Sequence, residues 1–460
     1  MKKFIISLIL FLNTFIVCSQ DLPKLIPYRK GMKWGFCNKN KQIIIPCKYD
    51  YVETFYGDFT VASINDRYGV INQKDSIIVP FIYEDVVIYN GLFSIEKNNK
   101  QSLINVKGET IIPFVYDYII GIDSNFFQVS LHYKLGIFDK SGKEILPPIY
   151  DFIDKFSDGK YAVVSVGSKR GIVDKNYKFF INPIYDHISS FYNGIAVAGL
   201  DRKLVLIDTT GKATIFPKYL DSHYGFMTAE IADVYNENME HGYINKNGQE
   251  VIGLSFHHAY PFWGDYASVE KETGWGVIDR KGNIIAPLIY DFAGHAKNNW
   301  IVVNKKNNYG IIDTTGKVII PLKYKMIDYK GGDWIVLKLK NKCKVINMIT
   351  KKSKTYKYTD VVYYGGEYAF SKSKKGKGLF YIGGKEIIPP MYQRLELDLE
   401  YGFIKVCLHN KWGVIDFKNN ILIPIKYDDM FYDFEDDLNL VELNGKKGYI
   451  DINGTEYWED

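Results

Sequence analysis

The amino-acid sequence predicts an all-β protein built as a tandem array of antiparallel β-meander repeats. Three observations predict this fold class. A unit of about 34 residues recurs 13 times between Gly35 and the C-terminus. Eleven of the twelve units that are long enough to test have a tyrosine 14 residues after the glycine that starts the unit. Turn-forming residues return at fixed places in each unit, and strand-like segments lie between them.

The repeat is defined by one glycine, which we number as position zero of each unit. This glycine occurs ten times, and a serine, a valine and a lysine replace it in three further units: Gly35, Gly69, Ser102, Gly136, Gly171, Val205, Gly242, Gly276, Gly310, Lys344, Gly378, Gly413 and Gly448. A fixed period of this size is typical of repeat proteins, in which each unit buries its apolar face only by stacking on its neighbours.

Within a unit, the residues predict three antiparallel strands. In residues 91–113 the first strand largely alternates apolar and polar residues, and turns follow at 97–100 and 105–108. Asparagine or aspartate at position 3 can accept hydrogen bonds from turn amides, and glycine at position 6 supplies the positive φ of a tight hairpin. Proline at position 11 marks the end of the third strand because it has no amide to donate. The short run that follows, as in Tyr49–Phe55, is expected to add a brief fourth strand or to cross to the next unit.

Aromatic residues are expected to hold neighbouring units together. Besides the tyrosine at position 14, a ring recurs near position 24, as in Phe59 and Phe93. One large ring in a fixed place can bury about 150–250 Å² against the next unit. We favour an open spiral or solenoid, because 13 units exceed the roughly four to eight blades of a common propeller and no linker separates two rings. One or two propeller-like rings are the alternative.

The best-preserved units carry a recognisable combination of motifs: KWGFCNKNKQIIIPCKYD from Lys33, GWGVIDRKGNIIAPLIYD from Gly274 and KWGVIDFKNNILIPIKYD from Lys411. The Trp-Gly pair, the Ile-Ile-Pro segment and the Tyr-Asp pair at fixed offsets resemble the WG repeat family of bacterial proteins. The resemblance covers nearly the whole chain after its first residues. It implies a repeat scaffold and brings no catalytic residues to this sequence. The units at Val205, Gly242 and Lys344 depart from the pattern.

Residues 1–19 have the pattern of a secretory signal peptide, and residues 20–460 are expected to form one continuous array. Two lysines precede an apolar run, Phe4–Val17, which is too short for a comfortable membrane span. We therefore expect an exported protein that is periplasmic, exposed at the cell surface or extracellular. Lipid attachment through Cys18 is a less favoured alternative, because the residues before this cysteine lack the small side chain next to it.

The charge of the chain argues against nucleic-acid binding. The formal net charge is +5, and loss of Lys2 and Lys3 with the signal peptide lowers it to +3, whereas nucleic-acid binding needs a concentrated basic surface. The exception is Leu337–Tyr358, which holds eight lysines. We interpret it as a solvated strand whose lysines protect an exposed sheet edge. An anion-binding patch is the alternative.

We expect no metal or cofactor. The sequence has no G-x-S-x-G, H-E-x-x-H, Walker or C-x-x-C motif, and we interpret the recurrent carboxylates at position 15 as turn caps rather than calcium ligands. Cys37 and Cys47 lie on the two arms of the first hairpin. Both a disulfide bond and packing as small apolar side chains remain open for this pair.

The residue before the glycine varies freely between units and is therefore expected to be partly exposed. Its aromatic examples are our candidate ligand contacts, because exposed rings can stack on sugars or anchor peptides: Trp34, Tyr68, Trp275, Tyr309 and Trp412. The alternative is that these rings cover the flank of the adjacent unit.

The sequence thus predicts a non-catalytic scaffold, secreted or surface-attached, that binds a protein or glycan partner. A second hypothesis is an enzyme acting on an envelope polymer, with a site in the irregular seventh unit around His257, His258 and Asp265. A third is a purely structural spacer of the envelope.

Overall fold

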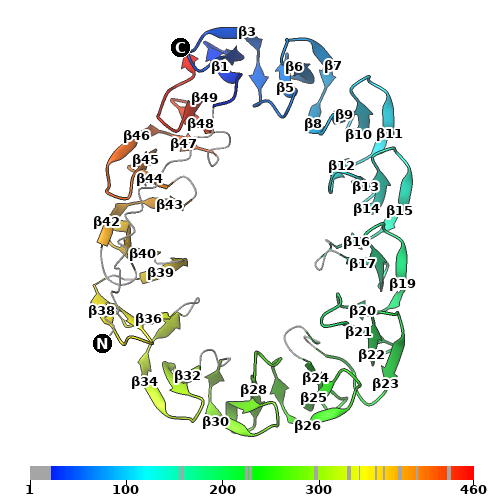
Figure 1. Cartoon of the computed structure of the whole chain (residues 1–460), viewed down its shortest axis with the longest axis vertical. Helices are drawn as coiled ribbons and strands as arrows, with labels where there is room; N and C mark the ends of the chain where they lie inside the picture. The colour runs from blue at the N-terminus through cyan, green and yellow to red at the C-terminus, as the bar shows by residue number, and fades with distance from the viewer. Residues whose placement is uncertain are drawn as a thin grey trace, which may run out of the picture.

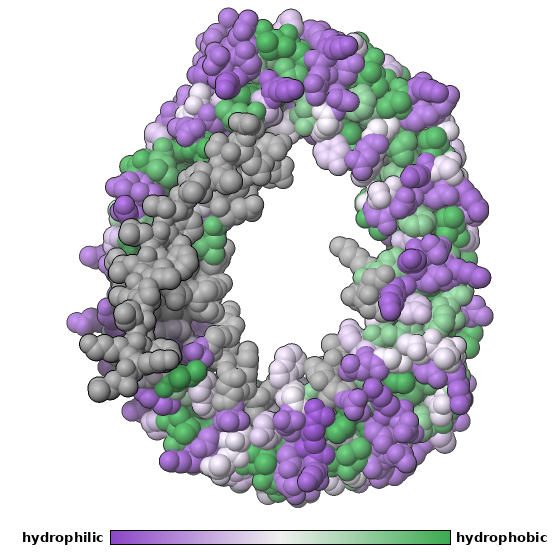
Figure 2. Space-filling view, in the orientation of Figure 1, coloured by the Kyte–Doolittle hydropathy of each residue, from purple (hydrophilic) through white to green (hydrophobic). Residues whose placement is uncertain are grey.

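The repeats form a closed ring of 13 β-sheets around a wide central opening (Figure 1). The computed structural model describes residues 22–460 apart from 155, 157–159, 223–225, 227–229, 295–298, 329–332, 341, 358–359, 366–367, 382–385, 400–401 and 432–436. The predicted signal peptide, residues 1–19, lies outside the described residues. Side chains do not fill the opening, as Figure 2 shows. Each sheet is therefore one blade of a single propeller-like ring.

Eleven blades have four strands and two have three. Their strands, from the inner to the outer strand of each blade, are: blade 1, β50 (Trp458–Glu459), β1 (Ile26–Lys30), β2 (Lys33–Cys37) and β3 (Ile43–Tyr49); blade 2, β4 (Tyr51–Val52), β5 (Phe59–Ile64), β6 (Arg67–Asn72) and β7 (Ile77–Tyr83); blade 3, β8 (Asp85–Tyr89), β9 (Leu92–Lys97), β10 (Lys100–Asn105) and β11 (Thr110–Tyr116); blade 4, β12 (Tyr118–Gly121), β13 (Phe126–Leu131), β14 (Lys134–Asp139) and β15 (Glu144–Tyr150); blade 5, β16 (Phe152–Ile153), β17 (Tyr161–Val166), β18 (Lys169–Asp174) and β19 (Phe179–Tyr185); blade 6, β20 (His187–Ile188), β21 (Ile195–Leu200), β22 (Lys203–Asp208) and β23 (Ala213–Phe216); blade 7, β24 (Ile231–Tyr235), β25 (His241–Asn245) and β26 (Glu250–Phe256); blade 8, β27 (His258–Ala259), β28 (Tyr266–Lys271), β29 (Gly274–Asp279) and β30 (Ile284–Tyr290); blade 9, β31 (Phe292–Ala293), β32 (Trp300–Lys305), β33 (Asn308–Asp313) and β34 (Val318–Tyr324); blade 10, β35 (Met326–Asp328), β36 (Trp334–Lys338), β37 (Cys343–Asn347) and β38 (Ser353–Tyr356); blade 11, β39 (Asp360–Gly365), β40 (Tyr368–Ser373), β41 (Gly376–Tyr381) and β42 (Glu386–Tyr392); blade 12, β43 (Arg394–Asp398), β44 (Phe403–Leu408), β45 (Lys411–Ile415) and β46 (Ile421–Tyr427); and blade 13, β47 (Asp429–Met430), β48 (Leu438–Leu443) and β49 (Lys446–Asp451).

This architecture confirms the all-β repeat and the brief fourth strand. The run after position 14 forms the inner strand of the next blade, as β4 does by pairing with β5. The expectation of an open spiral was wrong, and the alternative of one ring is confirmed. A rotation of about 28° between successive blades suffices to close 13 of them.

The ring closes where the two ends of the array meet. Strand β50 pairs with β1 in the register Arg29 with Trp458 and Lys30 with Glu459. Arg29 also donates from Nε to the Lys447 carbonyl at 2.8 Å. These contacts join segments more than 400 residues apart in sequence and complete the first blade.

The residue at position zero is a glycine because the backbone of the outer strand lies too close to leave room for a side chain. A Cβ at Gly35 would lie 2.4 Å from the Ile45 carbonyl oxygen, and a Cβ at Gly276 would lie 2.5 Å from that of Ala286. The outer strand bulges at this point, so the β2–β3 and β29–β30 registers shift. Where Val205 replaces the glycine, the β22–β23 register shows no shift. The residue at position zero therefore determines the shape of the blade edge.

Recurrent polar residues join neighbouring blades. The Tyr49 side chain is buried and its hydroxyl donates to Asp75 Oδ1 at 2.5 Å in the next blade. At position 15, Asp151 pairs with Lys134 in the preceding blade and accepts a hydrogen bond from the Gly167 amide in the following one at 2.7 Å. The interpretation of position 15 as a turn cap is thus confirmed. Because one aspartate reaches both hairpins, the equivalent hairpins of adjacent blades lie side by side on one face of the ring.

Candidate functional site

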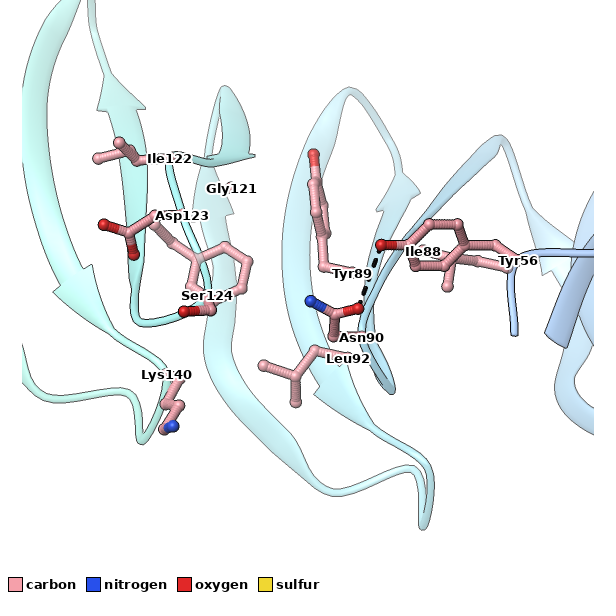
Figure 3. Close-up of a pocket in the computed structure, with 11 residues that line it drawn as sticks. Tyr56, Ile88, Tyr89, Asn90, Leu92, Gly121, Ile122, Asp123, Ser124 and Lys140 are labelled. Atoms are coloured by element: carbon pink, nitrogen blue, oxygen red, sulfur yellow. Dashed lines mark hydrogen bonds between the residues drawn. The ribbon is translucent and has the colours of Figure 1, made fainter. Parts of the chain in front are cut away.

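Among the described residues, a candidate site is a pocket of about 660 Å³ between blades 3 and 4 (Figure 3). Its position follows from the inner strands. Strands β8 and β12 have five and four residues, whereas the inner strands of several other blades have two. Strand β8 turns directly into β9 through Asn90 and Gly91, with φ of 45° and 82°, the positive φ values of a two-residue hairpin turn. The longer inner strands extend both walls of the gap between the blades.

Aromatic rings form one wall of this pocket. The Tyr89 ring lies against Gly121, where a Cβ would come within 2.8 Å of the ring, and meets the buried Phe127 edge-on at a centroid distance of 5.5 Å. Tyr56 reaches the pocket from blade 2 with 58% of its surface exposed. Its hydroxyl donates to Asn90 Oδ1 at 3.2 Å, the bond drawn in Figure 3. The glycine is needed here because any side chain would displace Tyr89.

Polar groups form the facing wall. Asp123 Oδ1 accepts hydrogen bonds from the amides of Asn125 at 2.7 Å and Phe126 at 3.0 Å, which fixes the carboxylate in its loop. Lys140 Nζ lies 3.3 Å from Asn125 Oδ1. Figure 3 shows Asp123, Ser124 and Lys140 across the pocket from Tyr89 and Leu92. The site thus sets polar side chains of blade 4 opposite the Tyr89 ring of blade 3.

This arrangement is suited to binding a small polar molecule that also has an apolar face. The volume falls within the roughly 300–1,000 Å³ of small-molecule sites. Aromatic faces stack on the C–H surface of a sugar ring, and the polar wall offers both donors and acceptors to hydroxyl groups. In the described part of the chain, no group of three or more His, Cys, Asp or Glu residues is arranged to hold a metal ion.

A smaller pocket of about 320 Å³ lies between blades 6 and 7. His187 Nε2 lies 2.8 Å from Asp221 Oδ1 across the two blades. The imidazole rests on Gly199, where a Cβ would clash with the ring at 2.2 Å. This pair holds the two blades together at the wall of the pocket.

The candidate contact residues lie in five different blades, and the structure does not gather them into one site. Trp34 and Trp412 are buried, at 7% and 8% exposure, which corrects the expectation that they are partly exposed. Trp34 packs edge-on against Tyr449 of the neighbouring blade at 5.9 Å, so it covers the flank of that blade. Tyr68, Trp275 and Tyr309 are half-buried.

The residues of the irregular seventh unit are also separated. His258 stacks on Trp275 at 6.3 Å, with Nε2 3.9 Å from Glu270. Register pairs His258 with Glu270, so Asp265 lies five residues away along the chain, about 16 Å in an extended strand. Asp265 pairs instead with Arg280 at 3.1 Å.

The cysteines show packing rather than pairing. Cys37 and Cys47 are both free, and burial raises the pKa of the Cys37 thiol to about 12. Cys37 is fully buried. The side chain therefore acts as a small apolar group.

Sequence reasoning missed the residues of the large pocket. Tyr56 and Asp123 both lie at position 21 of their units and Tyr89 lies at position 20, but the residue types at these two positions differ from unit to unit and mark no site. One local signal was present, because Asn90-Gly91 after an alternating run predicts a tight hairpin. The pocket itself forms between two blades, and a sequence pattern within one repeat does not predict how two blades meet.

A family model described as WG containing repeat matches ten segments of the chain: residues 34–68, 68–100, 102–134, 136–169, 171–203, 242–272, 275–309, 309–343, 383–412 and 412–446. These segments cover well over half of the sequence. The unmatched stretches 204–241 and 344–382 contain Val205 and Lys344, the two positions where the outer strand has no bulge. No curated protein sequence matches the chain.

Several solved structures are similar at low identity. The dihydro-heme d1 dehydrogenase NirN shares 13% identity, with 65% of this chain and 75% of that chain covered and a TM-score of 0.29. A eukaryotic initiation factor shares 10%, with 73% and 96% covered and a TM-score of 0.26. PorZ, a surface component of the type-IX secretion system of Porphyromonas gingivalis, shares 9%, with 95% and 79% covered and a TM-score of 0.21. None of the described residues forms a helix able to cross a bilayer.

Proposed function

This chain belongs to the WG containing repeat family, and from that premise we propose that it is a non-catalytic, exported scaffold that binds a neutral glycan between blades 3 and 4. The observation that carries the proposal is the pocket lined by Tyr56, Tyr89, Asn90, Asp123 and Lys140. A repeat frame supplies rigidity, while side chains that differ between blades supply the contacts.

The composition of the pocket favours a neutral sugar over a strongly charged ligand. Asp123 and Lys140 contribute opposite charges, so neither sign dominates the wall. The two tyrosines present ring faces and hydroxyl groups, a combination that suits a pyranose ring with its equatorial hydroxyls. Export follows from the signal-like pattern of residues 1–19 and suits a glycan of the cell envelope or the surroundings.

The proposal is tested by isothermal titration of the mature chain with cello-, xylo-, malto- and chito-oligosaccharides of four to six sugar units. We expect at least one series to bind, and Tyr89→Ala to weaken that binding by about tenfold or more, because a stacking face worth about 1.4 kcal/mol is lost. Asp123→Asn is expected to weaken it by a smaller factor without disturbing the ring packing.

Tyr133→Ala is the matched control, since Tyr133 lies in blade 4 with 95% exposure and does not line the pocket. Thermal unfolding of each variant checks that the ring remains folded. Binding that survives Tyr89→Ala and Asp123→Asn unchanged contradicts the site. The absence of binding in all four series at millimolar concentration contradicts the choice of ligand class.

A further inference from the structure

The basic charge of this protein is concentrated in one part of the ring. Residues 338–377 contain twelve lysines and two acidic residues, a formal charge of +10, whereas the whole chain carries +5. The remainder of the chain is therefore net acidic. Strands β37–β40 of blades 10 and 11 fall in this segment, and these two blades lie across the opening from β8 and β12 (Figure 1).

Six of these lysines lie in or beside two equivalent hairpins, and we call them the lysine arc: Lys340, Lys342, Lys344, Lys374, Lys375 and Lys377. The first three follow β36 or lie in β37, and the last three lie between β40 and β41 or in β41. Lys340, Lys342, Lys374 and Lys375 are exposed. The equivalent hairpins of adjacent blades lie on one face of the ring, so the two groups of lysines belong to the same face.

In most other blades, the basic residue of this hairpin is neutralised by the carboxylate at position 15. Lys100 pairs with Asp117 at 2.6 Å and Lys169 with Asp186 at 2.6 Å, and the same arrangement recurs in Lys33 with Asp50 and Lys411 with Asp428. These carboxylates also accept a hydrogen bond from the next hairpin. The repeat thus normally cancels its own positive charge on this face.

This cancelling carboxylate is missing beside the lysine arc. Position 15 is Lys325 in the unit of blade 9, Thr359 in that of blade 10 and Gln393 in that of blade 11. Gln393 keeps the cap, since its Oε1 accepts from the Asn410 amide at 2.7 Å, but it carries no charge. Among the described residues, no ion pair involves a lysine of the arc. The hairpins of blades 10 and 11 therefore carry additional lysines and lack the carboxylates that would neutralise them.

Edge protection explains other lysines of the segment but not the arc. Lys351, Lys352 and Lys354 lie on or beside β38, an outer strand that lacks the proline bulge and pairs in regular register. Lysines on such an edge prevent pairing with another sheet. The arc lies on hairpins instead, where no free strand edge needs protection.

We propose that the lysine arc binds a linear anionic polysaccharide. The two hairpins, residues 338–344 and 372–377, contain no aromatic residue and no arginine. They offer no stacking platform for nucleobases, which single-stranded nucleic acid requires. Leu339 is their only large apolar residue and is half-buried, so they lack the apolar face that an amphipathic membrane-binding surface inserts into a bilayer. Flexible ammonium groups match carboxylate or sulfate groups spaced along a polymer.

The surface is independent of the proposed glycan pocket, which lies in other blades and has mixed charge. Either proposal can fail without the other.

The experiment measures binding of the mature chain to immobilised alginate by biolayer interferometry at several salt concentrations. We expect affinity to fall steeply with salt, because neutralising several anionic groups releases their counterions. Replacing Lys340, Lys342, Lys374 and Lys375 together by Glu is expected to weaken binding by at least tenfold. Dextran, which is neutral, is expected not to bind.

Two control variants have matched charge changes. Lys39→Glu with Lys41→Glu changes an exposed turn of blade 1, and Lys351→Glu with Lys352→Glu changes the outer edge of blade 10. Each is compared with Lys374→Glu plus Lys375→Glu, and thermal unfolding verifies the fold of all variants. An equal loss of binding in the controls overturns the proposal, as does the absence of alginate binding. Tighter binding to single-stranded DNA or to phosphatidylglycerol vesicles overturns the choice of ligand class.

Discussion

The Ser102 hydroxyl donates a hydrogen bond of 2.6 Å to the carbonyl oxygen of Ile112. Ser102 occupies position zero, and Ile112 lies ten residues after it. In nine other blades the residue ten positions after the position-zero glycine turns its carbonyl oxygen toward that glycine, 2.4–2.9 Å from where a Cβ would lie. Serine is tolerated because its hydroxyl satisfies the oxygen that a methyl group would only crowd. The β10–β11 register accordingly keeps the bulge.

Replacing Ser102 therefore tests what the bulge requires. We expect Ser102→Val to lower stability by about 1–3 kcal/mol, because it crowds a packed site and leaves the buried Ile112 carbonyl without its donor. Ser102→Gly restores the residue of the other blades and is expected to cost less than about 1 kcal/mol. Urea unfolding followed by circular dichroism measures both. Both substitutions remove the hydroxyl donor, so equal effects contradict the claim that a larger apolar side chain crowds this site.

Acidification is expected to loosen the ring through the carboxylates at position 15. Hydrogen bonds, first from the Lys134 ammonium and then from the Gly167 amide, hold the pKa of Asp151 below its ordinary value, and equivalent partners do so for Asp117 and Asp186. A lowered native pKa stabilises the fold above the unfolded value near 4, and this contribution is lost as the pH falls through the native pKa. The thermal midpoint of the native chain should therefore drop between about pH 5 and 2.5.

The variant that replaces Asp117, Asp151 and Asp186 by Asn is expected to have a lower thermal midpoint than the native chain at pH 7. Its midpoint is expected to fall less when the pH is lowered. Asp58→Asn with Asp66→Asn is the control, because both aspartates are exposed and neither caps a neighbouring hairpin. If the thermal midpoints of the triple variant and the native chain fall in parallel with pH, this linkage is contradicted.

Removing residues 455–460 is expected to open the ring. The deletion takes away β50, the inner strand of blade 1, together with the pairing of Glu456 with Ile450 in blade 13. It also takes away the Trp458 ring that covers Gly448. We expect a larger radius of gyration in small-angle X-ray scattering and a thermal midpoint lower by several degrees.

Trp263→Ala provides the comparison, because it removes an exposed tryptophan from a blade away from the closure. An unchanged scattering curve after the terminal deletion means that blade packing alone closes the ring.

The sequence by itself determined the blade. Glycine at position zero and aspartate at position 3 act within their own blade, so their pattern predicts strands and turns. The aspartate caps could be predicted for the same reason: Asp279 Oδ1 accepts from the amides of Lys281 and Asn283 at 2.9 Å, within its own turn. The expectation that proline at position 11 ends the third strand was wrong: Pro46 lies inside β3, where the strand bulges and then continues to Tyr49.

Only the tertiary structure decided how the blades assemble and where a ligand can bind. Closure depends on the sum of 13 small rotations and on pairing between Arg29 and Trp458, which are separated by nearly the whole chain. The pocket likewise forms where Tyr89 of one blade meets Gly121 of the next. These features arise from the relative placement of complete blades, and a pattern confined to one repeat contains no information about that placement.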